Sequence, residues 1–227
     1  MTPERARSIV GGIGWLSRQP GAFRKALLEV AELRRVPAGG TIMVLDDPPG
    51  TLDCVVDGFV DVLSAPGPFP ARLAYLARAG WWFGDVAAVS RTTRRADLTA
   101  RTDVWLLHLP ERRLNHLMAA DGENWRRLAE LTVAHFDTAL QLAGCLAAQD
   151  VRQRVAAVIC WLSGPNFFSG TVAELPLTHE ALGEIAGVSR NTAGRVLADL
   201  AGLGLIETGY GRLVIADREG LEALLRA

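Results

Sequence analysis

The sequence predicts an α+β protein in which a β-rich N-terminal domain, a long central helix and a C-terminal winged helix-turn-helix follow one another. Three observations lead to this prediction. Short β-rich runs separated by turn residues recur over residues 41–110. An apolar pattern with helical spacing fills residues 123–149. Two short helical patterns that meet at Gly187 precede a glycine-rich hairpin.

The composition limits the class of protein. The chain has 227 residues, 49% of them hydrophobic, which is enough for two small domains with cores of their own. The formal net charge of −1 excludes a protein that coats nucleic acid with its whole surface, but it allows a local basic face. No apolar run has the length of a membrane span, and the N-terminus lacks a signal-peptide core, so we expect a cytoplasmic protein.

Cysteine and histidine give no sign of a metal or redox site. Cys54, Cys145 and Cys160 are odd in number and form no Cys-x-x-Cys pair, which argues against zinc, an iron–sulfur cluster and a disulfide framework. The histidines show no metal-ligand spacing. His135 lies on a predicted helix face, where a histidine is more often a packing residue than a haem ligand, so haem is not expected.

The N-terminal part changes from helix to strand along the chain. Residues 2–33 look helical in pieces, and 21–33 form the best piece before the Val-Pro-Ala-Gly-Gly run at 36–40 breaks it. Asp57-Gly58 is a hairpin turn signal, and the proline-rich residues 64–70 form a tip. Many short strands at regular spacing indicate a sandwich or a barrel. The expected strands are 41–45, 52–56, 59–63, 72–77, 98–100 and 104–109.

The stretch after the strands is helical, with a short helix at 111–119 and a long one at 123–149. The long helix has two apolar faces, one of which alternates spacings of three and four residues, as a coiled-coil seam does. We expect this face to pair two copies of the chain, with a core helix of a single domain as the alternative. Its members are Leu128, Leu131, His135, Thr138, Leu142 and Cys145. The second face, expected to cover the β-rich domain, includes Phe136, Leu140, Ala143 and Leu146.

Residues 177–198 have the pattern of a helix-turn-helix, which follows a further helix at 151–162. Thr178 is a candidate N-cap of its first helix, and Gly187 can take the left-handed conformation that ends that helix. Ser189 can cap the second helix. This second helix presents a polar face made of Arg190, Asn191, Thr192 and Arg195.

These residue types suit DNA. Arginine can bond guanine O6 and N7 together, and asparagine can bond adenine N6 and N7, so we assign base reading to Arg190, Asn191 and Arg195. Contacts to phosphate position a helix without reading sequence. We expect phosphate contacts from Ser189, Thr192, Thr178, His179 and Arg212. The alternative is a helical hairpin with a solvated arginine face.

The C-terminal end of the chain predicts a wing. A glycine-rich turn at 207–212 separates two short strands at 203–206 and 213–215. A two-stranded hairpin directly after a helix-turn-helix is a wing, and Arg212 at its base can touch backbone phosphate.

Residues 177–215 resemble the DNA-binding domain of the Crp/Fnr regulators. The family's second helix typically reads Ser-Arg-Glu-Thr-Val-x-Arg, and this chain has Ser-Arg-Asn-Thr-Ala-Gly-Arg at 189–195. Arg190 and Arg195 match the family's base-reading arginines, whereas Asn191 replaces the glutamate, so the operator is not carried over. The resemblance implies a bacterial homodimer that binds an inverted repeat in double-stranded DNA, with RNA polymerase as a further partner.

The resemblance extends to the β-rich domain through residues 38–40, 55–60 and 82–85. It implies a β-roll (jelly roll) of the cyclic-nucleotide-binding type that senses an effector. The domains it implies are a β-roll sensor at 1–120, a dimerisation helix at 121–149 and a winged helix-turn-helix at 150–227.

Residues 84–97 resemble the family's phosphate-binding cassette. Arg95 stands at the family's arginine position, where it can pair with a cyclic phosphate. Asp85 stands where a glutamate bonds the ribose but is one methylene shorter, and Ala96 replaces a residue with a hydroxyl. The residues expected to bind an effector are Gly84, Asp85, Val86, Arg95 and Ala96.

The identity of the effector stays open. Ala139 and Leu140 stand where the cyclic-AMP receptor directs hydroxyls at the base, and neither can bond adenine. We therefore expect an unidentified effector and weak or no binding of cyclic AMP, with a cyclic-nucleotide-responsive regulator as the alternative.

Two proteins of other classes are also compatible with parts of the sequence. One is a cupin-like enzyme with an accessory DNA-binding tail, and the other is an adaptor that has lost its DNA contacts. No Ser/His/Asp, Cys/His or paired-carboxylate constellation supports an enzyme, so catalysis is not expected. Arg190 and Arg195 argue against the adaptor.

Overall fold

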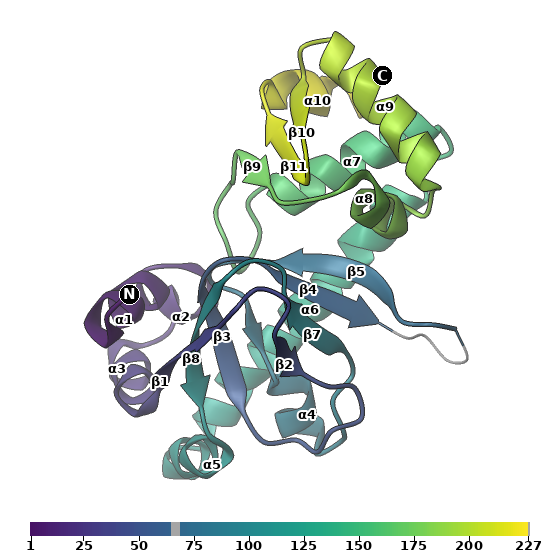
Figure 1. Ribbon diagram of the computed structural model, residues 1–227. Helices are drawn as coiled ribbons and strands as arrows, with labels where there is room; N and C mark the ends of the chain where they lie inside the picture. The colour runs from purple at the N-terminus through teal and green to yellow at the C-terminus, as the bar shows by residue number, and fades with distance from the viewer. Residues whose placement is uncertain (65–68, 227) are drawn as a thin grey trace. The chain divides into compact units, whose positions relative to one another are not determined.

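The computed structural model describes residues 1–64 and 69–226, and Figure 1 shows its helices and strands. Residues 65–68 of the predicted proline-rich tip lie outside this description. The contacts divide the chain into two units. The first comprises Met1–Ala71, Leu76–Phe136 and Asn166–Gly170, and the second comprises Arg72–Tyr75, Asp137–Pro165 and Thr171–Ala227. The predicted three-part division at residues 120 and 149 stays a prediction.

The first unit is built on two four-stranded sheets. The strands of one sheet are ordered β1-β8-β3-β6, and those of the other are ordered β2-β7-β4-β5. The pairs β1/β8, β3/β8 and β4/β7 are antiparallel. The predicted α+β architecture with a roll of short strands is confirmed. The bounds of the strands are β1 Glu32–Val36, β2 Thr41–Met43, β3 Leu52–Asp57, β4 Val60–Ser64, β5 Arg72–Ala77, β6 Trp82–Phe83, β7 Asp97–Ala100 and β8 Val104–Leu109.

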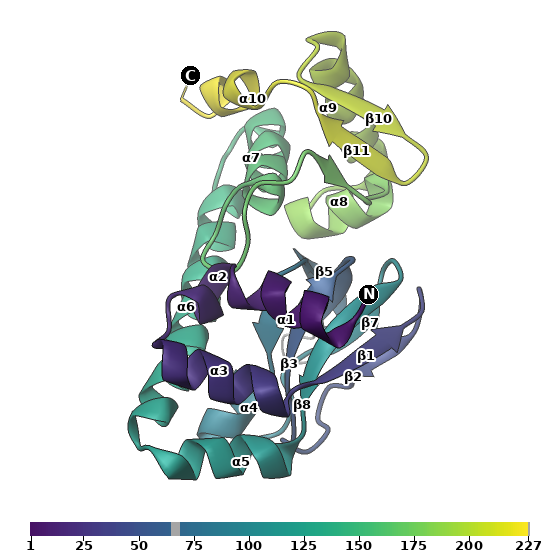
Figure 2. The same cartoon turned by 90° about the vertical axis from the view of Figure 1, so that its left-hand side faces the viewer.

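Strand β3 lies in the core because nearly its whole length is apolar. Leu52, Cys54 and Val55 are fully buried. The helices that precede the strands are α1 Pro3–Gly11, α2 Gly14–Ser17 and α3 Gly21–Val30. Figure 2 shows helices α1 and α3 beside the sheet that contains β3. A short helix, α4 Asp85–Ser90, follows β6.

The hairpin predicted at Asp57-Gly58 is wrong. A turn is present there, but the strands on its two sides pair in different sheets. Gly58 has a φ of +91°, and a Cβ at this position would lie 2.4 Å from the carbonyl oxygen of Asp103. Directly after the turn, the carbonyl of Phe59 accepts a hydrogen bond from the N–H of Arg101 at 2.9 Å. The chain therefore crosses from one sheet to the other. A turn signal in the local sequence does not show whether the two flanking strands pair with each other or join different sheets.

The predicted helix at 21–33 is too long. Helix α3 ends at Val30, because Ala31 already has an extended backbone with φ −78° and ψ 140°. Strand β1 then pairs with β8, from Glu32 opposite His108 to Val36 opposite Val104. The extended conformation of β1 depends on hydrogen bonds to β8, a strand some seventy residues later in the chain. The local sequence therefore does not reveal it.

The long helix is α6, Glu123–Leu146, and it follows α5, Glu111–Ala120. The prediction that this helix pairs two copies through the face of Leu128 is wrong for Leu128 and Leu131, which are fully buried inside the first unit, whereas Leu142 and Cys145 of that face are half-buried. The second face, predicted to cover the β-rich domain, is exposed instead: Val133 by 59%, Phe136 by 61% and Leu140 by 54%. Both faces repeat at the same spacing, so periodicity alone does not show which of them lies inside.

The second unit contains the helix-turn-helix and the wing. Helices α7 Val151–Ser163, α8 His179–Ala186 and α9 Arg190–Gly202 bury its apolar core. The wing strands are β10 Ile206–Gly209 and β11 Arg212–Ile215, and β9 Glu174–Leu175 adds to β11. A final helix, α10 Arg218–Leu224, follows. The strand predicted at 203–206 starts later, because α9 continues to Gly202 and Gly204 turns the chain with a φ of +74°.

Within the described residues, none of the helices is both long and apolar enough to cross a membrane. The same part of the chain contains no group of three or more His, Cys, Asp or Glu side chains placed to hold a metal ion.

Candidate nucleic-acid interface and ligand cavity

The two helices of the helix-turn-helix begin at the predicted caps. The Thr178 hydroxyl accepts a hydrogen bond from the backbone N–H of Ala181 at 3.1 Å. The Ser189 hydroxyl accepts one from the N–H of Thr192, also at 3.1 Å. Gly187 ends the first helix with a φ of +64°. These three capping predictions are confirmed, and they fix where α9 starts and which side chains fall on its first turn.

Close packing sets the angle between α8 and α9. A Cβ on Gly183 would lie 2.8 Å from the carbonyl oxygen of Val188, so only glycine fits where the turn crosses α8. On α9, Ala193 and Leu200 are fully buried. Because this face is anchored in the core, the other face of α9 is held rigidly toward solvent.

The outward face of α9 carries the predicted base-reading residues. Arg190, Asn191 and Arg195 are all exposed, and Thr192 is half-buried. His179 lies beside this face, because a Cβ on Gly194 would be 3.2 Å from its Nδ1 atom. The structure therefore brings these predicted contacts of helices α8 and α9 to one surface.

A hollow of about 460 Å³ borders helix α9. Its lining includes Thr192 and Arg195 from α9 and Arg152 from the first turn of α7. Arg152 has a buried Nε atom without a hydrogen-bond partner among the described residues. Sequence reasoning missed Arg152, because it belongs to no motif and only the fold places it beside α9.

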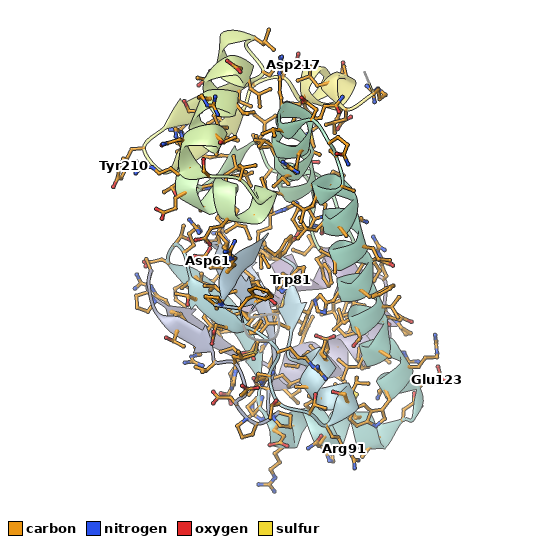
Figure 3. The ribbon with its side chains drawn as sticks, turned by 90° about the vertical axis from the view of Figure 1, so that its right-hand side faces the viewer. Asp61, Trp81, Arg91, Glu123, Tyr210 and Asp217 are labelled. Carbon is orange, nitrogen blue, oxygen red and sulfur yellow. The ribbon has the colours of Figure 1, made fainter. Side chains whose placement is uncertain are left out.

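The wing reaches the same part of the unit. Its turn contacts the start of α8, since a Cβ on Gly211 would lie 4.0 Å from the Thr178 methyl group. Tyr210 at the tip is fully exposed and points outward in Figure 3. Arg212 is not an unpartnered cation: its Nε lies 3.2 Å from Glu174 Oε1, and both side chains are more than half exposed. An exposed pair of this kind is weak, so a phosphate can displace the carboxylate.

The first unit contains a cavity of about 120 Å³ that brings the five predicted effector residues together. They are Gly84, Asp85, Val86, Arg95 and Ala96. The other lining residues, which the sequence did not single out for this site, are Met43, Val62, Trp81, Phe83, Ala87, Arg94, Leu98 and His135. Figure 3 labels Trp81, which lies among the side chains of this unit. The wall is therefore mainly apolar.

Asp85 is buried and engaged by helix α6. Its Oδ2 atom accepts a hydrogen bond from the Thr132 hydroxyl at 2.9 Å and lies 3.2 Å from His135 Nδ1. The His135 ring stacks on Phe168 with centroids 4.9 Å apart. The carboxylate expected to bond a ribose is thus held by the protein's own side chains. The prediction that placed His135 on a pairing face is wrong, because the ring faces the cavity instead.

The two arginines of the cassette have opposite environments. Arg95 is exposed at the cavity and makes one long bond, 3.4 Å, to the Thr92 hydroxyl. Arg94 is only 6% exposed, and its Nη2 donates to the carbonyl and hydroxyl of Thr51 at 3.2 and 3.0 Å. Burial lowers the pKa of Arg94, although nearby carboxylates oppose that shift. Neither Ala139 nor Leu140 borders the cavity; both are exposed on α6.

Comparisons with known proteins give the same picture for both units. Residues 153–224 match the Crp-like helix-turn-helix domain, and residues 33–121 match the cyclic nucleotide-binding domain. The chain is similar to the transcriptional regulator SdrP of Thermus thermophilus, with 29% identity over 190 residues, 82% of this chain and 90% of SdrP.

Solved structures agree. A CRP/FNR family transcriptional regulator from Thermus thermophilus superimposes with a TM-score of 0.66 at 28% identity, covering 86% of this chain and 99% of that one. FixK2 from Bradyrhizobium japonicum superimposes with a TM-score of 0.72 at 20% identity, covering 86% and 97%. The second likeness concerns the fold alone.

Proposed function

Because this chain is a transcription regulator of the Crp/Fnr type, we propose that two copies pair through α6 and read an inverted repeat in double-stranded DNA with helix α9. The observation that carries this proposal is the exposure of Arg190, Asn191 and Arg195 on one rigidly packed helix. Arginine and asparagine are the side chains that read guanine and adenine edges in the major groove. A regulator has to reach promoter DNA, so we place the protein in the cytoplasm, with RNA polymerase as a further partner.

The exposed face of α6 supports pairing with a second copy. Val133, Phe136, Leu140 and Ala143 follow one another at spacings of three, four and three residues. This is the spacing of a coiled-coil seam, and large apolar side chains exposed at such positions lose contact with water when two helices pair. The face differs from the one expected from the sequence, but the spacing argument is the same.

The remaining DNA contacts are assigned to phosphate. Ser189, Thr192, Thr178 and His179 surround the first turns of α8 and α9, and Arg212 lies at the wing. Such contacts set the position of α9 on the duplex and carry no sequence information. Arg152 joins this set, because it borders the same hollow as Thr192 and Arg195.

The β-roll cavity is the sensor site in this proposal, and cyclic AMP is not its effector. A base, a ribose and a cyclic phosphate need more room than about 120 Å³, since sites for ligands of that size measure roughly 300–1,000 Å³. The carboxylate at the ribose position is already bonded to Thr132 and His135. We expect calorimetry with cyclic AMP to show weak or no binding, and a dissociation constant of about 1 μM would contradict this expectation.

The DNA-binding part of the proposal is tested by salt-dependent binding to a promoter fragment. Affinity should fall as salt rises, because phosphate contacts release counterions. Arg212→Ala should weaken binding to every sequence alike and reduce the slope against salt by about one unit. Glu174→Gln is the matched control, since it removes the carboxylate that competes for Arg212 and should strengthen binding. Salt-independent binding would contradict the proposal.

A further inference from the structure

The wall of the cavity in the first unit includes a buried guanidinium, that of Arg94, with one nitrogen that is unpaired in the described part of the chain. Arg94 is 6% exposed, and its Nη1 atom is buried without a hydrogen-bond partner among the described residues. None of the ion pairs within 4 Å in that part of the chain involves Arg94. Buried charges in proteins are ordinarily paired, because leaving one unpaired costs several kcal/mol. An anion is the ligand that forms the strongest hydrogen bond with such a nitrogen.

Two of the carboxylates near Arg94, those of Asp53 and Asp85, are hydrogen-bonded to other side chains. Asp85 is bonded to Thr132 and His135, as described above. Asp53 accepts hydrogen bonds from the Thr51 hydroxyl at 2.6 Å and from His108 Nδ1 at 2.7 Å. The Thr51 hydroxyl in turn accepts a hydrogen bond from Arg94 Nη2. Asp53, through Thr51, therefore holds the Nη2 edge of the guanidinium in place. The other edge, Nη1, is buried against Gly84 and has no hydrogen-bond partner among the described residues.

The glycine at the cavity makes room for this edge. An ideal Cβ on Gly84 would lie 2.7 Å from Arg94 Nη1, and Gly84 has a φ of +103°. The same Cβ would lie 2.1 Å from the carbonyl oxygen of Thr51, so only glycine fits between the two groups. Gly84 and Arg94 both line the cavity, and the unpaired Nη1 lies directly against the glycine.

The rest of the wall decides the kind of anion. It also includes Asp85, Arg95 and His135, but most of its side chains are apolar: Met43, Val62, Trp81, Phe83, Val86 and Leu98. An apolar cavity of roughly 150 Å³ holds a molecule the size of benzene. The volume here, about 120 Å³, corresponds to one ring or a short branched chain.

We infer that the β-roll cavity binds a small organic carboxylate with an apolar body of about one ring, and that Arg94 Nη1, not Arg95, holds its carboxylate. This inference rests on the proposed role of the cavity as the sensor site and names the ligand class. The apolar body fills the space between Trp81 and Leu98, and Arg95 lies at the exposed side of the cavity.

Calorimetry on the purified full chain with benzoate and benzamide tests the charge requirement. The two molecules have nearly the same shape, and only benzoate is an anion. Hydrogen bonds to a charged group are worth about 1.5–3 kcal/mol, which corresponds to roughly 10- to 100-fold in affinity. We expect benzoate to bind at least about tenfold more tightly than benzamide. Equal affinities, or no binding of benzoate at about 10 mM, would overturn the inference.

Two arginine variants test the assignment. Arg94→Gln should weaken benzoate about tenfold or more, whereas Arg95→Gln, the matched control, should leave it nearly unchanged. The reverse ranking would overturn the assignment. Arg94→Gln could lose binding merely because the protein fails to fold, so Ala96→Leu provides a second test that leaves Arg94 in place. Ala96 is half-buried on the cavity wall, and a larger side chain there fills the space. This variant should abolish benzoate binding, and unchanged binding would contradict the site.

Binding to promoter DNA, measured on the same samples, separates this inference from the proposed function. If DNA binding persists while benzoate fails, only the ligand class is wrong. If DNA binding fails as well, the proposed regulator itself is wrong.

Discussion

The imidazole of His135 bridges Asp85 and Trp82: its Nδ1 lies 3.2 Å from the Asp85 carboxylate and its Nε2 lies 3.0 Å from the Trp82 carbonyl oxygen. Helix α6 is thereby joined to the start of α4 at the cavity wall. A ligand that enters the cavity meets this link between the β-roll and the long helix.

Removing His135 should destabilise the protein. His135→Ala leaves the buried Asp85 carboxylate with one fewer donor, and the expected loss is about 1–3 kcal/mol in the free energy of unfolding. Urea unfolding measures it. His116→Ala is the control, because His116 is exposed on α5 and should cost less than about 0.5 kcal/mol. Equal losses for the two variants would contradict the role assigned to His135.

His108 should make stability depend on pH. Its hydrogen bond to Asp53 raises the pKa of His108 above its usual value. The stabilisation is therefore fully present below the ordinary histidine pKa of about 6.5 and is lost as pH rises through the higher folded pKa. The stability difference between wild type and His108→Gln, measured in urea, should be larger near about pH 6 than near about pH 9. A difference that grows with pH would contradict the bond.

Gly183 should be needed for the helix-turn-helix. Gly183→Ala forces a Cβ to within 2.8 Å of the Val188 carbonyl oxygen and should lower stability by about 1–3 kcal/mol. Affinity for DNA should fall with it. Gly202→Ala is the matched control at the end of α9, where a Cβ meets nothing within 4 Å and should be neutral or stabilising. The packing argument fails if both variants behave alike in thermal unfolding.

The exposed face of α6 should hold the dimer together. Placing charges at its centre, with Phe136→Glu and Leu140→Glu, should convert a dimer into a monomer in light scattering at about micromolar concentration. Gln141→Glu adds a charge at a neighbouring exposed position and should leave the dimer intact. A wild-type monomer, or a dimer that survives the double substitution, would place the interface elsewhere.

The features that sequence predicts well here are those fixed by neighbouring residues. Thr178, Gly187 and Ser189 cap or end their helices through contacts three residues away, so residue type and spacing are sufficient. The five cassette residues are close in sequence and also meet in one cavity. The features that sequence missed depend on distant partners.

Strand β1 exists because β8 pairs with it, and the two sides of the Asp57-Gly58 turn belong to different sheets. For the same reason, the burial of Leu128 and Leu131 on one face of α6 follows from the packing of the first unit, not from the periodicity of the helix. Arg94 and Arg95 are adjacent arginines, and the sequence does not show that only Arg94 is buried. The fold decides this, because the side chain of Arg94 packs against Gly84.

Selection of binding sites from a randomised DNA library, carried out with wild type and with Arg190→Ala, examines the recognition helix itself. Wild type should enrich an inverted repeat whose half-sites lie about one helical turn, roughly 34 Å, apart. Arg190→Ala should lose about 1–3 kcal/mol and relax the preference at one symmetric base pair of each half-site. Arg112→Ala, an exposed arginine on α5, should leave the profile unchanged. A library without an enriched inverted repeat, or an Arg190→Ala profile identical to that of wild type, would contradict the reading of DNA by helix α9.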